Sequence, residues 1–189
     1  YDFTGCFYTN CLDSAKSPLT LNGSDTLTVS GNLTLGGTAV LNGAVSVGGN
    51  MSVAGAATLG ASVTSTGSQH WQGAVDITHN VAINGAGLRF DGDLNGPHRL
   101  VLTDSGNTTI SGAVGNVSAP LHFETNGAGT TTISGGLVRS SGTASQVYNT
   151  DVVVTTSTLF DTTNNGALPG GAAITFTKTL NGTTGNTES

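Results

Sequence analysis

The clearest pattern along the chain is an alternation of apolar and polar residues. Every odd position from Leu33 to Val63 carries Leu, Val, Met, Ala or Gly, and most even positions between them carry Thr, Ser, Asn or another small residue. A period of two is that of an extended strand with one face toward a core. The pattern therefore predicts short β-strands whose odd-numbered side chains are buried.

A second period, of six residues, lies on top of the first. Large apolar residues recur at one phase of this period, and Gly or Ala follows two positions later. These positions are Leu35, Leu41, Val47, Val53 and Leu59, followed by Gly37, Gly43, Gly49, Gly55 and Ala61. A small residue at every third inward position leaves room for a bend, so each unit predicts one strand and one corner. A short repeat of this kind is typical of a chain that coils on itself or winds with copies of itself.

We predict an all-β chain that forms a single-chain, three-sided parallel β-helix, or β-solenoid, over residues 21–182. The regular six-residue units cover about 31–88, and looser coils cover about 89–182. Residues 1–20 are predicted to be an N-terminal cap or contact segment, and residues 183–189 a flexible tail or a truncation point. With about 18 to 20 residues per coil, a chain that was solenoid throughout would form about ten coils.

Composition supports a folded β-structure. Only 8% of the residues are charged and 5% are aromatic, whereas Gly supplies 29 of 189 positions. The sustained alternation with Leu, Val and Ile supplies a core that disordered, Gly- and Ser-rich chains lack. Helix is disfavoured because Gly and β-branched residues are frequent and no stretch keeps a 3.6-residue period.

Charge and hydropathy exclude two classes of partner. The net charge is −6 and the chain has five Lys and Arg residues, which do not cluster. Because a phosphate backbone is bound by clustered basic residues, we predict no nucleic-acid partner. No run of 18 apolar residues occurs, so we predict no membrane span.

The two cysteines, Cys6 and Cys11, lie close together near the start of the sequence. A pair this close, with no further Cys and no nearby His, suits one small disulfide-closed loop in an exported protein. Free thiols and a link between subunits are the alternatives. The sequence begins at Tyr1 rather than Met, which indicates either a processed precursor or an excerpt from a longer protein.

Carboxylates that could carry chemistry are few. Asp91 and Asp93 lie on alternate residues, and Asp104 and Glu124 lie further along the chain. Polysaccharide-cleaving enzymes use paired carboxylates, and a catalytic interpretation requires a groove where Asp91, Asp93 or Glu124 meet Arg89, Arg99 or Arg139. The simpler interpretation is a polar turn at Asp91–Asp93. We therefore predict that the protein is not an enzyme.

Histidine spacing predicts no metal site. The four histidines are His70, His79, His98 and His122, and none forms a recognised ligand pair. His79 occupies an inward phase where Gly or Ala is usual, so it is predicted to mark a corner or a satisfied polar group. We predict no cofactor and no metal.

Longer-range similarity appears beyond residue 85. Gly67–Trp71 is echoed by Ala144–Tyr148, and Phe90–Gly96 by Phe176–Gly182. The two offsets differ, which predicts an insertion near Asn164–Gly171. Asn107–Gly112 and Thr130–Gly135 form a shorter echo with a spacing of 24 or 23 residues, depending on the register.

These repeats resemble those of a known group of exported proteins. The segments Phe90–Gly96, Thr108–Gly115, Thr130–Gly136 and Gln146–Asn149 are similar in style to repeats of filamentous-haemagglutinin-like and autotransporter-type β-helix exoproteins. The resemblance implies a right-handed parallel β-helix, export across a bacterial envelope, and roles in adhesion or filament formation. The regular units of 33–85 also resemble phage tail-fibre shafts, which implies the alternative of a trimeric, intertwined β-fibre.

The expected function is therefore that of an exported, non-catalytic structural protein, located at the cell surface or outside the cell. It would form or decorate a filament, sheath or adhesive fibre through self-association, head-to-tail or lateral, and cell-surface glycans are a further expected partner. The alternative is a phage tail-fibre or receptor-binding shaft. A polysaccharide lyase and an ice-binding solenoid, suggested by Thr26/Thr28 and Thr130/Thr132, are less favoured.

Overall fold

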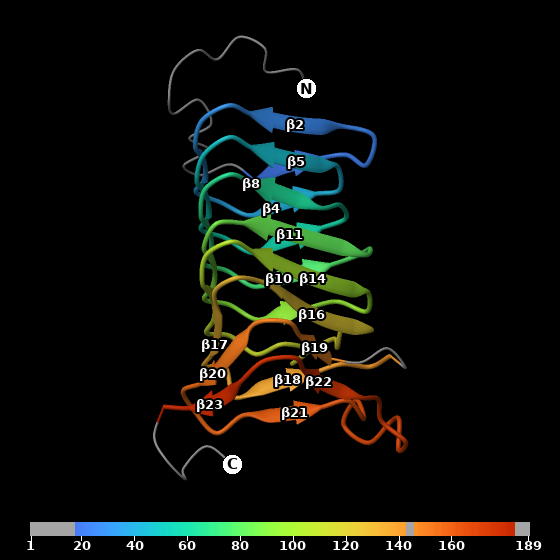
Figure 1. Ribbon diagram of the computed structural model, residues 1–189. Coiled ribbons are helices and arrows are strands. Elements are labelled where there is room, and N and C mark those ends of the chain that lie inside the picture. Colours follow the sequence, from blue (N-terminus) through green and yellow to red (C-terminus); the bar gives the residue numbers. More distant parts are fainter. Residues whose placement is uncertain (1–17, 143–145, 184–189) are drawn as a thin grey trace.

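The protein is an all-β solenoid of about seven turns (Figure 1). The computed structural model describes residues 18–142 and 146–183, and over these ranges the chain forms 23 strands and no helix. Every strand pairing is parallel, and one chain supplies all three sides of the coil. The described residues accordingly contain no helix that is long and apolar enough to span a membrane.

Three parallel sheets form the three sides, and we number them in the order in which the chain visits them. Sheet 1 contains β1 (Leu19–Leu21), β4 (Ala39–Leu41), β7 (Ala57–Leu59), β10 (Val75–Ile77) and β13 (Leu94–Asn95). Single-residue bridges through Val114 continue it to β18 (Leu137–Arg139) and β21 (Leu159–Asp161).

Sheets 2 and 3 each contain eight strands. Sheet 2 contains β2 (Thr26–Val29), β5 (Ala44–Val47), β8 (Val63–Ser65), β11 (Val81–Gly85), β14 (Arg99–Asp104), β16 (His122–Gly127), β19 (Gln146–Tyr148) and β22 (Ile174–Phe176). Sheet 3 contains β3 (Leu33–Leu35), β6 (Met51–Val53), β9 (Gln69–Trp71), β12 (Leu88–Phe90), β15 (Thr108–Ile110), β17 (Thr130–Ile133), β20 (Asp151–Val154) and β23 (Leu180–Gly182).

The length of a coil grows along the chain. Hydrogen bonds between neighbouring coils join residues 18 apart at Asn32 and Asn50, 23 apart at Asn107 and Thr130, and 28 apart at Asp151 and Thr179. The expected 18 to 20 residues thus hold for the regular units, and the later coils carry loops. These loops, together with residues outside the described ranges, explain why about seven turns are observed where about ten were expected. With eight strands in a sheet, the stack spans about 34 Å at a strand spacing of about 4.8 Å.

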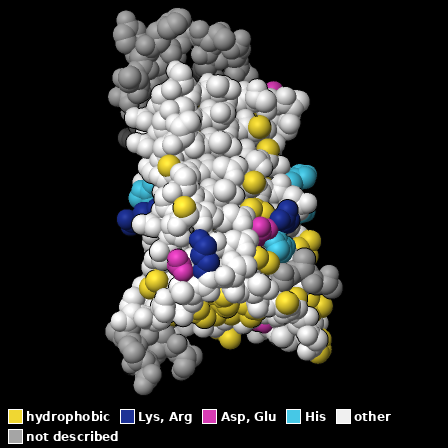
Figure 2. All heavy atoms as spheres, viewed as in Figure 1, with side chains coloured by type: hydrophobic (Ala, Val, Ile, Leu, Met, Phe, Trp, Pro, Cys, Tyr) yellow, Lys and Arg dark blue, Asp and Glu magenta, His cyan; other side chains and the backbone are white. Residues whose placement is uncertain are grey.

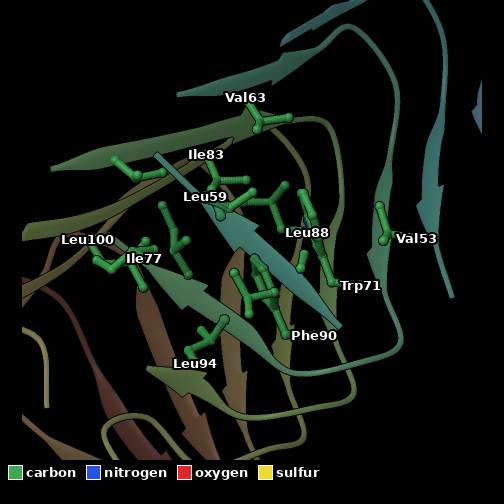
Figure 3. Close-up of a cluster of buried hydrophobic side chains, with 14 of the residues drawn as sticks. Val53, Leu59, Val63, Trp71, Ile77, Ile83, Leu88, Phe90, Leu94 and Leu100 are labelled. Carbon is green, nitrogen blue, oxygen red and sulfur yellow. The ribbon is translucent and has the colours of Figure 1, made fainter. Parts of the chain in front are cut away.

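The predicted burial pattern is confirmed in the regular region. Leu33, Leu41, Val53 and Ile83 are at most 1% exposed, and Figure 3 shows the core side chains of successive coils meeting inside the solenoid. The inward phase changes from odd to even residues after β11, so that Leu88 is buried. The corner between β11 and β12 contains Gly87 at φ +109°, a backbone conformation that favours glycine.

Aromatic side chains of neighbouring coils stack along the coil axis. Trp71 and Phe90 are strand partners in β9 and β12, and their ring centroids lie 6.4 Å apart at an interplanar angle of 7°. Tyr148 and Phe176 are partners in β19 and β22, with centroids 4.6 Å apart at 8°. In-register pairing therefore places like residues above one another in the core.

One corner is built from a column of glycines. At the corner from sheet 3 to sheet 1, an added Cβ on each glycine after the first would lie within 2.7 Å of the backbone of the glycine one coil earlier. The column consists of Gly37, Gly55, Gly73, Gly92, Gly112 and Gly135. Every third small residue of the six-residue period, such as Gly37, Gly55 and Gly73, thus lies in close contact with the neighbouring coil at this corner.

The corner from sheet 2 to sheet 3 is closed by asparagines. Asn32 Oδ1 accepts a hydrogen bond from the backbone N–H of Asn50 at 2.8 Å, and Asn50 Oδ1 accepts one from the N–H of Ser68 at 2.9 Å. Asn107 repeats the arrangement with the N–H of Thr130 at 2.9 Å. These side chains satisfy backbone donors that the bend leaves without a ladder partner.

The sequence echo around Gln69 and Gln146 has a structural basis. Both amides are fully buried, and each accepts a hydrogen bond from the aromatic residue two positions later, Trp71 Nε1 at 3.2 Å and Tyr148 OH at 3.0 Å. The two copies lie on different sides, because β9 belongs to sheet 3 and β19 to sheet 2. The expected insertion is confirmed in the loop between β21 and β22, which contains Asn164–Gly171.

Candidate functional site

The carboxylate predicted at a turn, Asp91, lies at the corner after β12 on sheet 3. Its Oδ1 accepts a hydrogen bond from Arg89 Nε at 2.8 Å, and its Oδ2 lies 2.7 Å from His70 Nε2 on the neighbouring strand β9. The hydrogen bond from Arg89, followed by that from His70, lowers the pKa of Asp91 below its ordinary value of 3.8. The group is an ion pair at an outer corner.

Glu124 lies in the middle of β16 on sheet 2. Its Oε2 lies 2.6 Å from Arg99 Nη2 and 3.0 Å from His122 Nε2, and its Oε1 accepts a hydrogen bond from Asn126 at 3.0 Å. Burial raises the pKa of Glu124, but the hydrogen bonds from His122, Asn126 and Arg99 outweigh it and lower that pKa below 4.5. The other ring nitrogen of His122, Nδ1, is buried and has no hydrogen-bond partner among the described residues.

The third arginine, Arg139, pairs with Asp161 on sheet 1. The Nε of Arg139 lies 2.9 Å from Asp161 Oδ2, and the backbone N–H groups of Thr163 and Asn165 donate to the same carboxylate. Burial raises the pKa of Asp161, but the hydrogen bonds from Thr163, Asn165 and Arg139 lower it to about 2. This carboxylate holds the start of the loop between β21 and β22.

Asp93 and Asp104 support the backbone. Asp93 accepts hydrogen bonds from the N–H of Ala113 at 2.9 Å and from the Asn116 side chain at 2.9 Å. Asp104 is only 2% exposed and points inward, where the N–H groups of Gly87 and Leu88 donate to it at 2.6 and 2.8 Å. Both carboxylates accept hydrogen bonds from backbone N–H groups near corners, in place of the carbonyl of a neighbouring strand.

The structure therefore distributes the candidate catalytic residues over three sides. Arg89 with Asp91 belongs to sheet 3, Arg99 with Glu124 to sheet 2, and Arg139 with Asp161 to sheet 1. Asp91 meets Arg89 and Glu124 meets Arg99, but the two pairs lie on different sides, so the described residues do not bring these carboxylates together at one site.

The histidines do not form a metal site either. His79 lies at the corner between β10 and β11, as predicted, and its ring stacks on that of His98 with centroids 5.8 Å apart. Over the described ranges, no group of three or more His, Cys, Asp or Glu residues could hold a metal ion. Cys6 and Cys11, and with them the predicted disulfide, lie outside the described residues.

The outer surface of the N-terminal coils is uncharged and polar. Residues 26–75 contain no Asp, Glu, Lys or Arg, and on the face in Figure 2 the Lys, Arg and His side chains lie over the middle and C-terminal coils. Thr26 and Thr28 pair with Ala44 and Ser46 in the next coil, so the Thr pair is not repeated there.

The C-terminal end of the solenoid exposes apolar side chains that the sequence analysis did not single out. Leu159 in β21, Ile174 in β22 and Leu180 in β23 are 59%, 37% and 45% exposed. In contrast, Leu21 and Leu27 in the first strands are at most 4% exposed. The only signal in the sequence was the return of large apolar residues at inward positions of the last coil.

Comparison with known proteins adds no relative: no protein-family model, no curated protein and no solved structure matches the chain.

Proposed function

We propose that the protein is an exported, non-catalytic structural protein that forms or decorates an extracellular filament, sheath or adhesive fibre. The observation that carries this proposal is the distribution of its ionisable side chains. Within the described residues, three arginine–carboxylate pairs lie on three separate sheets, and the N-terminal coils carry uncharged hydroxyl, amide and methyl groups. Such a surface suits packing against neighbours or hydrated polymers better than it suits bond cleavage.

The proposed role is mechanical. In a solenoid each coil contacts only its neighbours, so stiffness comes from continuous backbone ladders and a core that runs through every coil. Eight strands in sheets 2 and 3 give seven successive ladder steps. The core residues Leu33, Leu59, Ile83 and Phe123 are completely buried along this length. The repeat style shared with filamentous-haemagglutinin-like exoproteins supports the same role.

Negative-stain electron microscopy of the native protein, together with its mass in solution, tests the proposal. We expect filaments, sheets or surface fibres, and antibody labelling of intact source cells outside the envelope. Discrete trimeric rods would favour a phage-fibre shaft instead. Single rods that shorten a polysaccharide in a viscosity assay would overturn the proposal and indicate a lyase.

A further inference from the structure

We propose that one corner of the solenoid binds an acidic polysaccharide, a polymer of carboxylate-bearing sugars, at mildly acidic pH. The site is the corner from sheet 1 to sheet 2, where His79, His98 and His122 lie in three successive coils. We call these residues, together with Arg99 and Glu124, the histidine corner. The inference rests on the proposed function, because it names the class of partner that an extracellular structural protein would hold.

The backbone register brings the three histidines to one edge. His79 precedes β11 and His98 precedes β14, and their rings stack with centroids 5.8 Å apart at an interplanar angle of 10°. His122 begins β16, where its register partner is Arg99, the residue next to His98 in the sequence. Strands β11, β14 and β16 begin at the same edge of the solenoid in Figure 1, and Figure 2 shows histidine, basic and acidic side chains together at that edge.

The histidine corner is open to solvent over most of its length. The Arg99 side chain is 52% exposed, His79 is exposed and His98 is half-buried. Leu121, whose backbone N–H donates to the His98 carbonyl at 3.0 Å, adds an apolar side chain that is 45% exposed. The His122 side chain is only 12% exposed, so it contributes charge more than contact. A polymer lying along this edge would therefore meet imidazole rings, a guanidinium and an apolar group.

The charge of this corner depends on pH. The carboxylate of Glu124 lies 2.6 Å from Arg99 Nη2 and 3.0 Å from His122 Nε2, so the arginine and the carboxylate balance when the histidines are neutral. The register partners of Glu124 on sheet 2, Val101 and Val147, carry no charge. Histidine gains its positive charge between pH 8 and pH 5. A fall in pH therefore makes a neutral corner positive, and it strengthens the attraction for a polyanion.

The surroundings leave this positive charge largely unopposed. The preceding coil turns this corner through residues 60–62 and the following coil through residues 140–142, and neither segment contains an ionisable side chain. Arg139, next to the second segment, is paired with Asp161. Asp76, exposed on β10 three positions before the first histidine, adds one negative charge. In a chain with a net charge of −6 when the histidines are neutral, the corner becomes a local site for anions.

A polymer fits the histidine corner better than a small anion. Neighbouring coils are about 4.8 Å apart, so the cationic groups recur along the solenoid axis. A chain with a carboxylate on successive sugars can pair with several of them at once, and linked contacts raise the overall affinity. The five Lys and Arg residues are not clustered as a phosphate backbone requires, which favours a sugar polymer over a nucleic acid.

Titration of the full chain with polygalacturonate at pH 5 and pH 8, followed by calorimetry at low salt, tests the inference. The carboxylates of this probe are ionised at both pH values. We expect binding at pH 5 to be at least about tenfold tighter than at pH 8, and to weaken as salt is added. Neutral dextran should not bind at either pH.

His79→Gln combined with His98→Gln removes two titrating groups from the accessible part of the histidine corner. We expect this double variant to reduce the difference between pH 5 and pH 8 to less than about threefold. His70→Gln is the matched control, because His70 lies on sheet 3, where it pairs with Asp91, and it should keep the full difference. Circular dichroism verifies that each variant is folded, and His98→Gln alone repeats the test if the double variant is not.

The outcomes separate this inference from the proposed function. Equal binding at the two pH values, an equal loss in both variants, or a preference for polyphosphate over polygalacturonate would overturn the inference. Filaments seen by electron microscopy in a protein that binds no polysaccharide would refute the histidine corner alone. Polygalacturonate that is bound and then shortened would instead refute the structural, non-catalytic function.

Discussion

Gly73 gives the sharpest test of how successive coils fit together. It lies in the glycine column at the corner from sheet 3 to sheet 1, between β9 and β10. A Cβ added there would lie 2.5 Å from the carbonyl carbon and oxygen of Gly55 and 2.6 Å from the N of Ala56. Those atoms are backbone, so Gly73→Ala cannot be accommodated by turning a side chain.

The corner has little freedom to move. Ladder hydrogen bonds flank it on both sides, from the N–H of Gln72 to the oxygen of Val53 at 2.9 Å and from the N–H of Ala57 to the oxygen of Ala74 at 2.8 Å. Forcing extra volume into a packed site costs about 1–3 kcal/mol. Replacing Gly by Ala restricts the unfolded chain and offsets about 0.4–1 kcal/mol of that. The net loss of unfolding free energy is then roughly 1–2 kcal/mol, which lowers Tm by about 2–8 °C in a chain of this size.

Thermal unfolding followed by far-UV circular dichroism and by the fluorescence of Trp71 measures the effect. Trp71 is the only tryptophan, it is 1% exposed, and it lies two residues from the substitution. The control is Gly23→Ala, whose added Cβ would meet only the Asn42 oxygen at 3.8 Å, an ordinary contact. Equal Tm values for the two variants would refute the argument that coil-to-coil contact requires glycine at this corner.

Two further predictions concern buried polar groups. Gln69→Met removes the hydrogen-bond partner of the Asn84 carbonyl and of the Trp71 N–H, so we expect the unfolding free energy to fall by about 1–3 kcal/mol in denaturant titrations. The control, Gln72→Met, changes an exposed glutamine and should alter that free energy little. Equal stability of the two variants would contradict the prediction. The pKa of Asp161 is lowered from 3.8 to about 2 in the folded protein, so its ionised form stabilises the fold. We expect this to contribute roughly 2 kcal/mol to the unfolding free energy above pH 4, and the contribution to be lost as the pH falls to 2. Asp161→Asn should therefore flatten the stability profile between pH 4 and 2, and an unchanged slope would refute the assignment.

Local periodicity was enough to predict the solenoid. A period of two specifies one buried face, and a small residue every six positions specifies corners, so Leu35, Leu41, Val53 and Leu59 could be assigned to the core before the coils were known. The corner position of His79 and the turn at Asp91 were also predicted correctly. Each of these features depends on neighbouring residues in the sequence.

The register between coils depends on distant residues, and sequence periodicity did not predict all of it. The shorter echo was compatible with two spacings, and the pairing of Thr108 with Thr131 selects 23. The inward turn of Asp104 follows from the N–H groups of Gly87 and Leu88, which lie in the preceding coil. A polar side chain is buried only where hydrogen-bond donors or acceptors can pair with it, and the alternation of apolar and polar residues does not show where those groups lie.

The sequence by itself determined that this chain is a β-solenoid, because strand and corner preferences act over six residues. Only the tertiary structure decided which side each charged residue occupies, since loops change the coil length and so rotate later residues around the axis. It separated Asp91 from Glu124 and left Ile174 and Leu180 exposed at the last coil. Those placements depend on how many residues each coil contains, a sum over the whole chain rather than a local property.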